Sequence, residues 1–318
     1  MKRIFVLLIF LSFGLFAKNL VNPTYVYEVS SGLVTDVLYA SNMLYVSTDN
    51  GNVEIFDTKK RKKVDYIALP KIYDFMGDEV GSKVFSMDML HGKLLILSQE
   101  SGGFGRIHLY LDHKLQKVVS KDDMLNIIKA KFIDDDTIVM ALISNDIISY
   151  NIKTKKKNWV RQASMSKFSS FALNNDRSMV AIADESGDVH ILSTKDGHIV
   201  KKLSGQNVDN IFSIDFKADS VITGGQDRRA GIYNVKSAKG YYRESQFFVY
   251  GVGLSPSGKI GAYSSDMNNN VTLFNIDSNA VIGKYASDKM IVNGIYFINE
   301  KEFFINSSSH SVRYFKIK

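Results

Sequence analysis

The residues that could perform chemistry in this chain of 318 residues are few and scattered. The run Asp134–Asp136 offers three carboxylates, the ligand type that Ca²⁺ prefers, but a calcium site needs about six to eight oxygen ligands. Asn174–Asp176 stands at the equivalent place in the next stretch of chain. Because Asn and Asp favour tight turns, we interpret both segments as turns rather than metal sites.

Other catalytic patterns are missing from the sequence. There is no H-E-x-x-H, G-x-S-x-G, P-loop or G-x-G-x-x-G motif. The absence of cysteine excludes disulfides, thiol catalysis and Cys-ligated zinc or iron–sulfur clusters. His108 and His113 fall on opposite faces of a strand and its end, and we expect both to be polar residues at the solvent edge. The sequence therefore predicts a protein that is not an enzyme, with no cofactor and no metal.

The residues discussed so far belong to a pattern of strands and turns that is repeated along the chain. It consists of an apolar strand, a turn of small residues with an acid or amide, and a second alternating strand. The copies span 44–57, 94–111, 138–152, 179–193, 221–235, 260–276 and 303–317, and they begin 50, 44, 41, 42, 39 and 43 residues apart. A period of this length made of short strands predicts an all-β fold, a seven-bladed β-propeller with four strands in each blade.

The two ends of the chain complement each other in this arrangement. The seventh copy stops at Lys318, after only the third strand of its blade, and the extended segment Thr24–Val29 belongs to no other blade. We predict that Thr24–Val29 supplies the missing outer strand. The ring is then closed by this N-terminal strand, which removes two unpaired sheet edges.

Several of the strands resemble those of the WD40 repeat family. The resemblance is carried by Phe212–Phe216, Gly224–Asp227, Gly231–Val235, Leu254–Gly258 and Ser264–Asp266. The Trp-Asp dipeptide of that family is approximated only by Phe56–Asp57, and no Gly-His pair precedes an inner strand. The resemblance implies a WD40-like propeller that binds other proteins, without the buried polar network of the family.

The first residues indicate export. Lys2 and Arg3 precede an apolar run at 4–16, which is the layout of a signal peptide. The run is shorter than the ~20 residues that span a membrane. We therefore predict a signal peptide at residues 1–17, a propeller at 18–318, no membrane span after cleavage, and a periplasmic location.

Charge gives no support for nucleic-acid binding. The formal net charge is +7, and the excess lies partly in the lysine runs 59–63 and 155–157. Both runs are expected at turns that lead into the outer strand of a blade, where lysine prevents edge-to-edge aggregation.

Size, export signal and repeat style are similar to the NapL family of accessory proteins of the periplasmic nitrate reductase. This resemblance implies a scaffold that matures or supports nitrate respiration, with protein partners such as nitrate reductase components; we expect the protein itself to be a monomer. Two alternatives are a propeller scaffold of outer-membrane assembly and a propeller enzyme such as a lactonase.

The first spacing exceeds the others because of a long connection at 70–83. The apolar residues expected there in solvent are Ile72, Tyr73, Phe75 and Met76, and the extended turn 99–105 of the second blade adds Phe104. Both connections emerge on the same side of a propeller, so we predict that they are neighbours. Exposed apolar residues of this kind mark partner sites; the alternative is a loop that plugs the channel.

Two lysines, Lys129 and Lys131, fall in the innermost strand of the third blade. Near the axis they could attract an anion, or pair with Asp36 or Asp215 across the channel. The sequence leaves both interpretations open.

Overall fold

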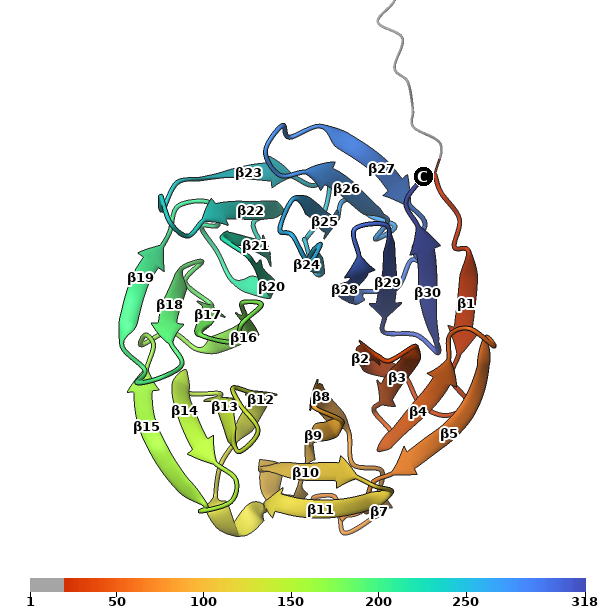
Figure 1. Cartoon of the computed structure of the whole chain (residues 1–318), viewed down its shortest axis with the longest axis vertical. Helices are drawn as coiled ribbons and strands as arrows, with labels where there is room; N and C mark the ends of the chain where they lie inside the picture. The colour runs from red at the N-terminus through yellow and green to blue at the C-terminus, as the bar shows by residue number, and fades with distance from the viewer. Residues whose placement is uncertain (1–19) are drawn as a thin grey trace, which may run out of the picture.

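The computed structural model describes residues 20–318 and forms seven four-stranded antiparallel sheets around a central axis (Figure 1). Each sheet is one blade, and its strands are named a to d from the axis outward. The predicted seven-bladed β-propeller is therefore confirmed. The predicted signal peptide at residues 1–17 lies outside the described residues.

The strands follow the chain blade by blade. Blade 1 contains β2 (Val34–Ala40), β3 (Met43–Thr48), β4 (Asn52–Asp57) and β5 (Lys62–Ala68). Blade 2 contains β8 (Val84–Leu90), β9 (Lys93–Gln99), β10 (Gly105–Leu111) and β11 (Lys114–Val119). Blade 3 contains β12 (Ile127–Phe132), β13 (Thr137–Leu142), β14 (Asp146–Asn151) and β15 (Lys156–Gln162). Blade 4 contains β16 (Phe168–Leu173), β17 (Met179–Asp184), β18 (Val189–Ser193) and β19 (Ile199–Leu203).

Blade 5 contains β20 (Ile211–Lys217), β21 (Ser220–Gly225), β22 (Arg229–Asn234) and β23 (Gly240–Glu244). Blade 6 contains β24 (Val252–Leu254), β25 (Ile260–Ser264), β26 (Val271–Asn275) and β27 (Val281–Tyr285). Blade 7 contains β28 (Val292–Asn299), β29 (Glu302–Ser307), β30 (Ser311–Lys316) and the N-terminal β1 (Tyr25–Glu28). A separate small hairpin of β6 (Ile72–Tyr73) and β7 (Glu79–Val80) lies between blades 1 and 2.

The N-terminal strand closes the ring, as predicted. β1 pairs antiparallel with β30, so blade 7 is built from both ends of the described chain (Figure 1). The preceding residue Val21 also bonds to the outer strand of blade 6, donating to the carbonyl of Lys284 at 2.8 Å and accepting from the N–H of Ala286 at 2.9 Å. The N-terminal segment therefore holds blades 6 and 7 together.

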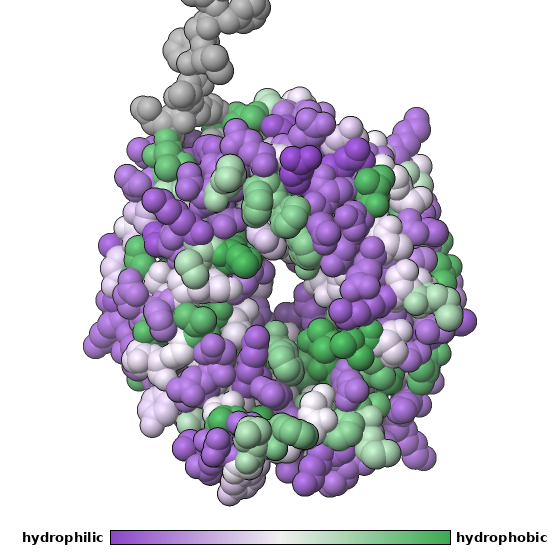
Figure 2. All heavy atoms as spheres, turned by 180° about the vertical axis from the view of Figure 1, so that it is seen from behind, coloured by the Kyte–Doolittle hydropathy of each residue, from purple (hydrophilic) through white to green (hydrophobic). Residues whose placement is uncertain are grey.

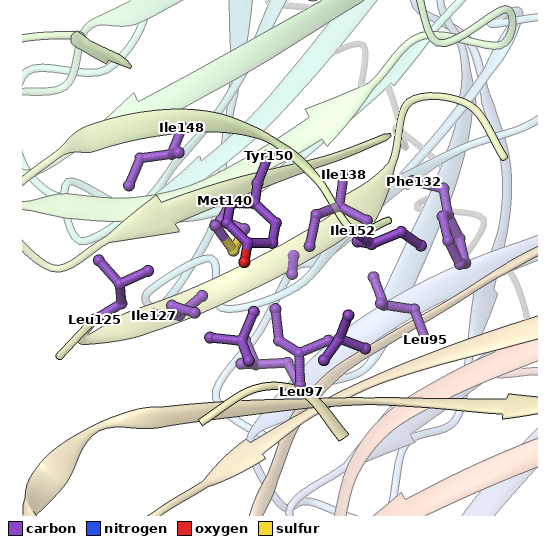
Figure 3. Packing of buried hydrophobic residues seen from close by; sticks show 14 residues of the cluster. Leu95, Leu97, Leu125, Ile127, Phe132, Ile138, Met140, Ile148, Tyr150 and Ile152 are labelled. Atoms are coloured by element: carbon purple, nitrogen blue, oxygen red, sulfur yellow. The ribbon is translucent and has the colours of Figure 1, made fainter. Parts of the chain in front are cut away.

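The core consists of seven hydrophobic clusters, one between each pair of neighbouring blades. In β9, Leu94 and Ile96 face blade 1, whereas Leu95 and Leu97 face blade 3. Figure 3 shows Leu95 and Leu97 opposite Ile127 and its neighbours. Because a b strand has a blade on each side, both of its faces are buried, and the middle of β9 is a continuous apolar run, Leu94–Leu97.

A β-bulge recurs near the start of the a strand in six of the seven blades. A bulge sets two residues against one on the partner strand, and here two consecutive residues of the a strand line the channel. The pairs are Thr35–Asp36, Phe85–Ser86, Ile128–Lys129, Ser169–Ser170, Phe212–Ser213 and Asn293–Gly294.

No helix in residues 20–318 is both long enough and apolar enough to cross a membrane.

Candidate functional site

The two faces of the disk differ in the hydrophobic side chains that they expose. We call the side with the d–a and b–c connections the loop face, and the side with the a–b and c–d turns the turn face. Eleven of the large exposed hydrophobic residues belong to loop-face connections: Leu33, Tyr73, Phe75, Met76, Met124, Ile143, Met165, Val208, Met267, Met290 and Ile291. Among the described residues, no large exposed hydrophobic residue lies in an a–b or c–d turn; Leu111, Ile199 and Val281 are strand residues at that end of their blades.

The most exposed group on the loop face is the projecting hairpin, residues 70–83. Its side chains of Tyr73, Phe75 and Met76 are 63%, 102% and 81% exposed. These three residues therefore lie in solvent, as the sequence predicted. Figure 2 shows that hydrophobic surface also adjoins the mouth of the central channel.

Ile72 corrects the prediction that four apolar residues of this segment are exposed. Its side chain is only 3% exposed, because the segment is a short strand rather than a loop. Side chains alternate along a strand, so Ile72 points inward while Tyr73 points outward. Phe104 is half-buried, and its ring lies against Gly102.

The hairpin and the b–c turn of blade 2 are neighbours, as predicted. The backbone N–H of Tyr73 donates to Ser101 Oγ at 3.3 Å, and the Ser101 hydroxyl donates to the carbonyl of Tyr73 at 3.0 Å. The 3-10 turn Ser101–Gly103 therefore supports one side of the hairpin.

Buried polar side chains fix the base of the hairpin. The guanidinium of Arg106 donates to the carbonyl of Pro70 at 2.6 Å and lies 3.6 Å from the carboxylate of Glu100. At the other end, the Ser82 hydroxyl donates to the carbonyl of Gln99 at 2.6 Å. The tip is thus held away from the disk by a rigid base.

The channel-plug alternative is wrong for this hairpin. None of Ile72, Tyr73, Phe75, Met76 and Phe104 belongs to the residues that line the central cavity.

The central channel contains a cavity of about 650 Å³ lined by a-strand residues of all seven blades. Seven charged side chains line it: Asp36, Asp88, Asp215, Lys129, Lys131, Arg177 and Lys217. The cations exceed the carboxylates by one, so the cavity carries a small positive charge.

All three carboxylates join neighbouring blades. Asp36 accepts from the N–H of Met87 at 2.8 Å, Asp88 from Phe132 at 2.7 Å, and Asp215 from Leu254 at 2.9 Å. In each case the donor belongs to the a strand of the next blade. These bonds satisfy backbone N–H groups that would be costly to leave unpaired in the channel wall, and the sequence contained no local signal for them.

Two of the four cations are paired with these carboxylates. Arg177 Nη1 lies 2.5 Å from Asp88 Oδ2, and Lys217 Nζ lies 3.3 Å from Asp215 Oδ1.

Lys129 and Lys131 both line the cavity, but they differ in their partners. Lys131 Nζ donates to the carbonyl of Met87 at 2.5 Å, which ties blade 3 to blade 2. Lys129 Nζ donates to the hydroxyl of Ser170 at 3.0 Å. Within residues 20–318 neither lysine forms an ion pair with Asp36 or Asp215, so the predicted pairing across the axis is not observed.

The charge on Lys129 is disfavoured. Burial and the positive charge of Lys131 lower the pKa of Lys129 from 10.5 to about 8, while Asp36 and Asp215 act in the opposite direction. Because a buried charge is stabilised by an opposite charge, an anion beside Lys129 would relieve this cost.

His108 contradicts the prediction of a solvent-edge residue. It is 3% exposed, since β10 lies between β9 and β11 and its side chain points into the blade interface. Burial, with the nearby charges of Arg106 and Lys117, lowers its pKa from 6.5 to about 4. Because this pKa lies well below 7, the ring is neutral at pH 7. Its Nδ1 has no hydrogen-bond partner among the described residues.

The run Asp134–Asp136 is the a–b turn of blade 3, as predicted. Asp135 lies 2.9 Å from Lys93 Nζ and 3.1 Å from His91 Nδ1. In the part of the chain that the structure describes, no group of three or more His, Asp or Glu residues could hold a metal ion.

The chain matches no family model and no curated protein. Its architecture is therefore known from the structure alone: a seven-bladed β-propeller with a hydrophobic loop face and a charged central cavity.

Proposed function

We propose that this protein is a non-catalytic scaffold that binds a protein partner through its loop face, with the projecting hairpin as the main contact. The observation that carries the proposal is the exposure of Tyr73, Phe75 and Met76 on a hairpin with a fixed base. Aromatic and Met side chains are enriched at interface centres and dominate binding energy there. A rigid base also lowers the entropy lost on binding.

The hairpin also indicates the chemistry of the partner. Asp74 and Asp78 flank the exposed tip, where a carboxylate oxygen of Asp74 accepts from the backbone N–H groups of Met76 and Asp78, at 2.9 Å each. A complementary surface therefore has an apolar pocket with a basic rim, because opposite charges at a rim steer association.

Binding rather than catalysis is supported by the use of the cavity carboxylates. All three bond to the backbone of the next blade, and two of them also pair with cations. A general acid or base needs a titratable group free to exchange a proton with a substrate.

The location and partner proposed from the sequence extend this function. We propose that residues 1–17 are an export signal and that the protein works in the periplasm. From the resemblance to the WD40 repeat and to NapL proteins, we propose that the partner is a component of the periplasmic nitrate reductase system.

A photo-crosslinking amino acid at Phe75, compared with one at Tyr66, tests the site in the host organism. Tyr66 is a matched control because it is 60% exposed but lies on the outer strand of blade 1. We expect one dominant crosslinked protein from position 75 and none from position 66, identified by mass spectrometry. A nitrate reductase component supports the NapL-like role, whereas an outer-membrane assembly protein supports that alternative instead.

The affinity of the purified pair tests the hairpin directly. Changing Tyr73, Phe75 and Met76 together to Ser should weaken binding by well over tenfold, since truncating a true anchor costs ~2 kcal/mol or more. The control changes Val64, Tyr66 and other exposed outer-strand residues to Ser. Equal affinities of wild type and the hairpin variant, both correctly folded, would place the interface elsewhere.

A further inference from the structure

The central cavity has the size and composition of a ligand site. Its volume of about 650 Å³ falls within the roughly 300–1,000 Å³ of typical small-molecule pockets. A bare inorganic ion would fill only a small part of it, so the polar and apolar regions of the wall define a larger ligand.

Hydrogen-bond donors gather on the wall formed by blades 3, 4 and 5. Lys129, Ser170 and Ser213 occupy the same position, directly after the bulge, in three successive a strands. The Ser170 hydroxyl accepts from Lys129, and no acceptor within residues 20–318 takes a hydroxyl proton from Ser170 or Ser213. An ammonium group has three donors, and only one of those on Lys129 is used by a described residue.

The opposite wall leaves space for a ligand, and its carboxylate is bound by neighbouring groups of the wall. Gly294 occupies the equivalent position in blade 7 and contributes no side chain. The carboxylate of Asp36 in blade 1 is bound by the Tyr296 hydroxyl at 2.6 Å and by the N–H of Met87. Asp36 is therefore part of the wall and does not compete for Lys129 at ion-pair distance.

Aromatic side chains line the cavity close to these donors. Lys129 Nζ is 5.5 Å from the ring centroid of Phe171. The bulge residues Phe85 and Phe212 line the cavity nearer the start of the a strands. Phe212 stacks on Tyr250, with ring centroids 5.3 Å apart and planes inclined by 23°. This end of the cavity offers flat apolar surfaces to a ligand.

We propose that the channel binds an organic carboxylate with a flat apolar body. The carboxylate is held by Lys129 Nζ and the hydroxyls of Ser170 and Ser213, and the body lies against Phe85 and Phe212. Within the described chain, neither Lys129 nor Lys131 is paired with a carboxylate, but Lys131 donates to the carbonyl of Met87, so Lys129 is the cation that lies among the serine hydroxyls. One ammonium among neutral donors suits a monoanion with two oxygens, whereas a phosphate is bound better by arginine and backbone N–H groups. This site is independent of the protein-binding hairpin.

Calorimetry with 3-phenylpropionate at pH 7 tests the site. We expect binding with a Kd below 1 mM, a range reached by small ligands with one charge contact and an apolar body. Two controls test the two parts of the ligand separately: acetate lacks the apolar body, and 3-phenylpropionamide lacks the negative charge. Both should bind at least tenfold more weakly than 3-phenylpropionate. No binding of 3-phenylpropionate at 10 mM, or equal binding of the amide, would overturn the proposal.

Variants of the wall locate the carboxylate. Lys129→Met should weaken 3-phenylpropionate binding at least tenfold, and the double change Ser170→Ala and Ser213→Ala should weaken it severalfold. Lys131→Met is the matched control because this lysine lies in the same strand but donates to Met87; it should change the affinity by less than threefold. If Lys131→Met abolishes binding while Lys129→Met does not, the assignment is wrong. Thermal melting of each variant checks folding. If either lysine variant unfolds, the double serine variant still tests the site.

Two sources could supply such a carboxylate, a free small acid or the C-terminal residue of a polypeptide. A tetraglycyl-phenylalanine peptide with a free C-terminus, compared with its amide, distinguishes them. Tighter binding of the free peptide than of 3-phenylpropionate assigns the site to a chain terminus, and binding of 3-phenylpropionate alone assigns it to a small metabolite. Both results support the carboxylate site, and failure of both probes removes it without affecting the hairpin interface.

Discussion

The loop face and the turn face are made from the same repeated blade, yet they expose different residues. The loop-face connections carry eleven large exposed hydrophobic residues, and the described a–b and c–d turns carry none. Turn-face connections close antiparallel pairs within one blade and are short. Their residues are dictated by turn geometry: Asn151, at the end of a c strand, accepts from the backbone N–H groups of Lys153 and Thr154 at 3.1 and 2.8 Å.

The geometry of the fold constrains the d–a connections of the loop face less. The d–a segments pass from one blade to the next, so their length and composition are free to vary. The projecting hairpin and the aromatic cluster around Phe212 and Tyr250 both belong to this face. In this protein, the hairpin and the aromatic cluster therefore occur where the repeat does not require a particular turn.

The largest expected effect comes from removing the strand on which both faces depend. Deleting residues 20–29 removes the pairing of β1 with β30 and the buried side chains of Tyr27 and Val29. Loss of a large buried aromatic residue alone costs about 3–5 kcal/mol. We expect the melting temperature to fall by about 10 °C or more, measured by circular dichroism. A chain lacking only residues 1–19 is the control, and equal melting of the two chains would show that the segment is dispensable.

The next largest effect is the acid sensitivity of blade 2, whose buried polar residues support the hairpin. His108 has a pKa of about 4 when folded and 6.5 as its ordinary value. Between these values the unfolded chain binds more protons, so stability falls as pH decreases from 6.5 to 4, by about 2–3 kcal/mol. Urea unfolding at pH 7 and pH 4.5 should show this loss reduced in His108→Leu and retained in His113→Leu. His113 is exposed on the turn face, and equal losses in both variants would contradict the assignment.

A smaller effect concerns the channel, which lies between the two faces. The pKa of Lys129 is about 8 in the free protein, and a carboxylate ligand binds the protonated amine. The affinity for 3-phenylpropionate should therefore stay constant below pH 7 and fall about tenfold from pH 7 to pH 9. The charged groups that act on this amine are Lys131 in its own strand, Asp36 in β2, and Asp215 and Lys217 in β20. Affinity that stays unchanged up to pH 9 would show that Lys129 does not hold the ligand.

The smallest effect separates stability from binding on the two faces. Asn151→Ala removes the side chain that closes a turn-face loop and should lower the free energy of unfolding by about 1 kcal/mol. It should leave partner affinity unchanged. Phe75→Ser on the loop face should weaken partner binding and leave the free energy of unfolding unchanged, because the Phe75 side chain is fully exposed. Chemical unfolding and binding measurements on both variants test this prediction. If each variant changes both the free energy of unfolding and the partner affinity, the two faces do not differ in this way.

The sequence by itself determined the blade count, the order of strands and the closure of the ring by the segment Thr24–Val29, within which β1 lies. These features depend on a period of about forty residues and on alternation within single strands. It also placed the hairpin beside the b–c turn of blade 2, because the side on which a connection emerges follows from strand order.

Only the tertiary structure decided which candidate residues are exposed and which groups they bond. It buried Ile72 and His108, tied Lys131 to Met87 in the previous blade, and left Lys129 beside the hydroxyl of Ser170. The contacts of Lys129 and Lys131 depend on a one-residue bulge and on partners about forty residues away. A bulge turns two consecutive residues to the axis and interrupts the alternation of the strand, and the partner across a blade interface is chosen by packing. Alternation within a single strand therefore predicts neither of them.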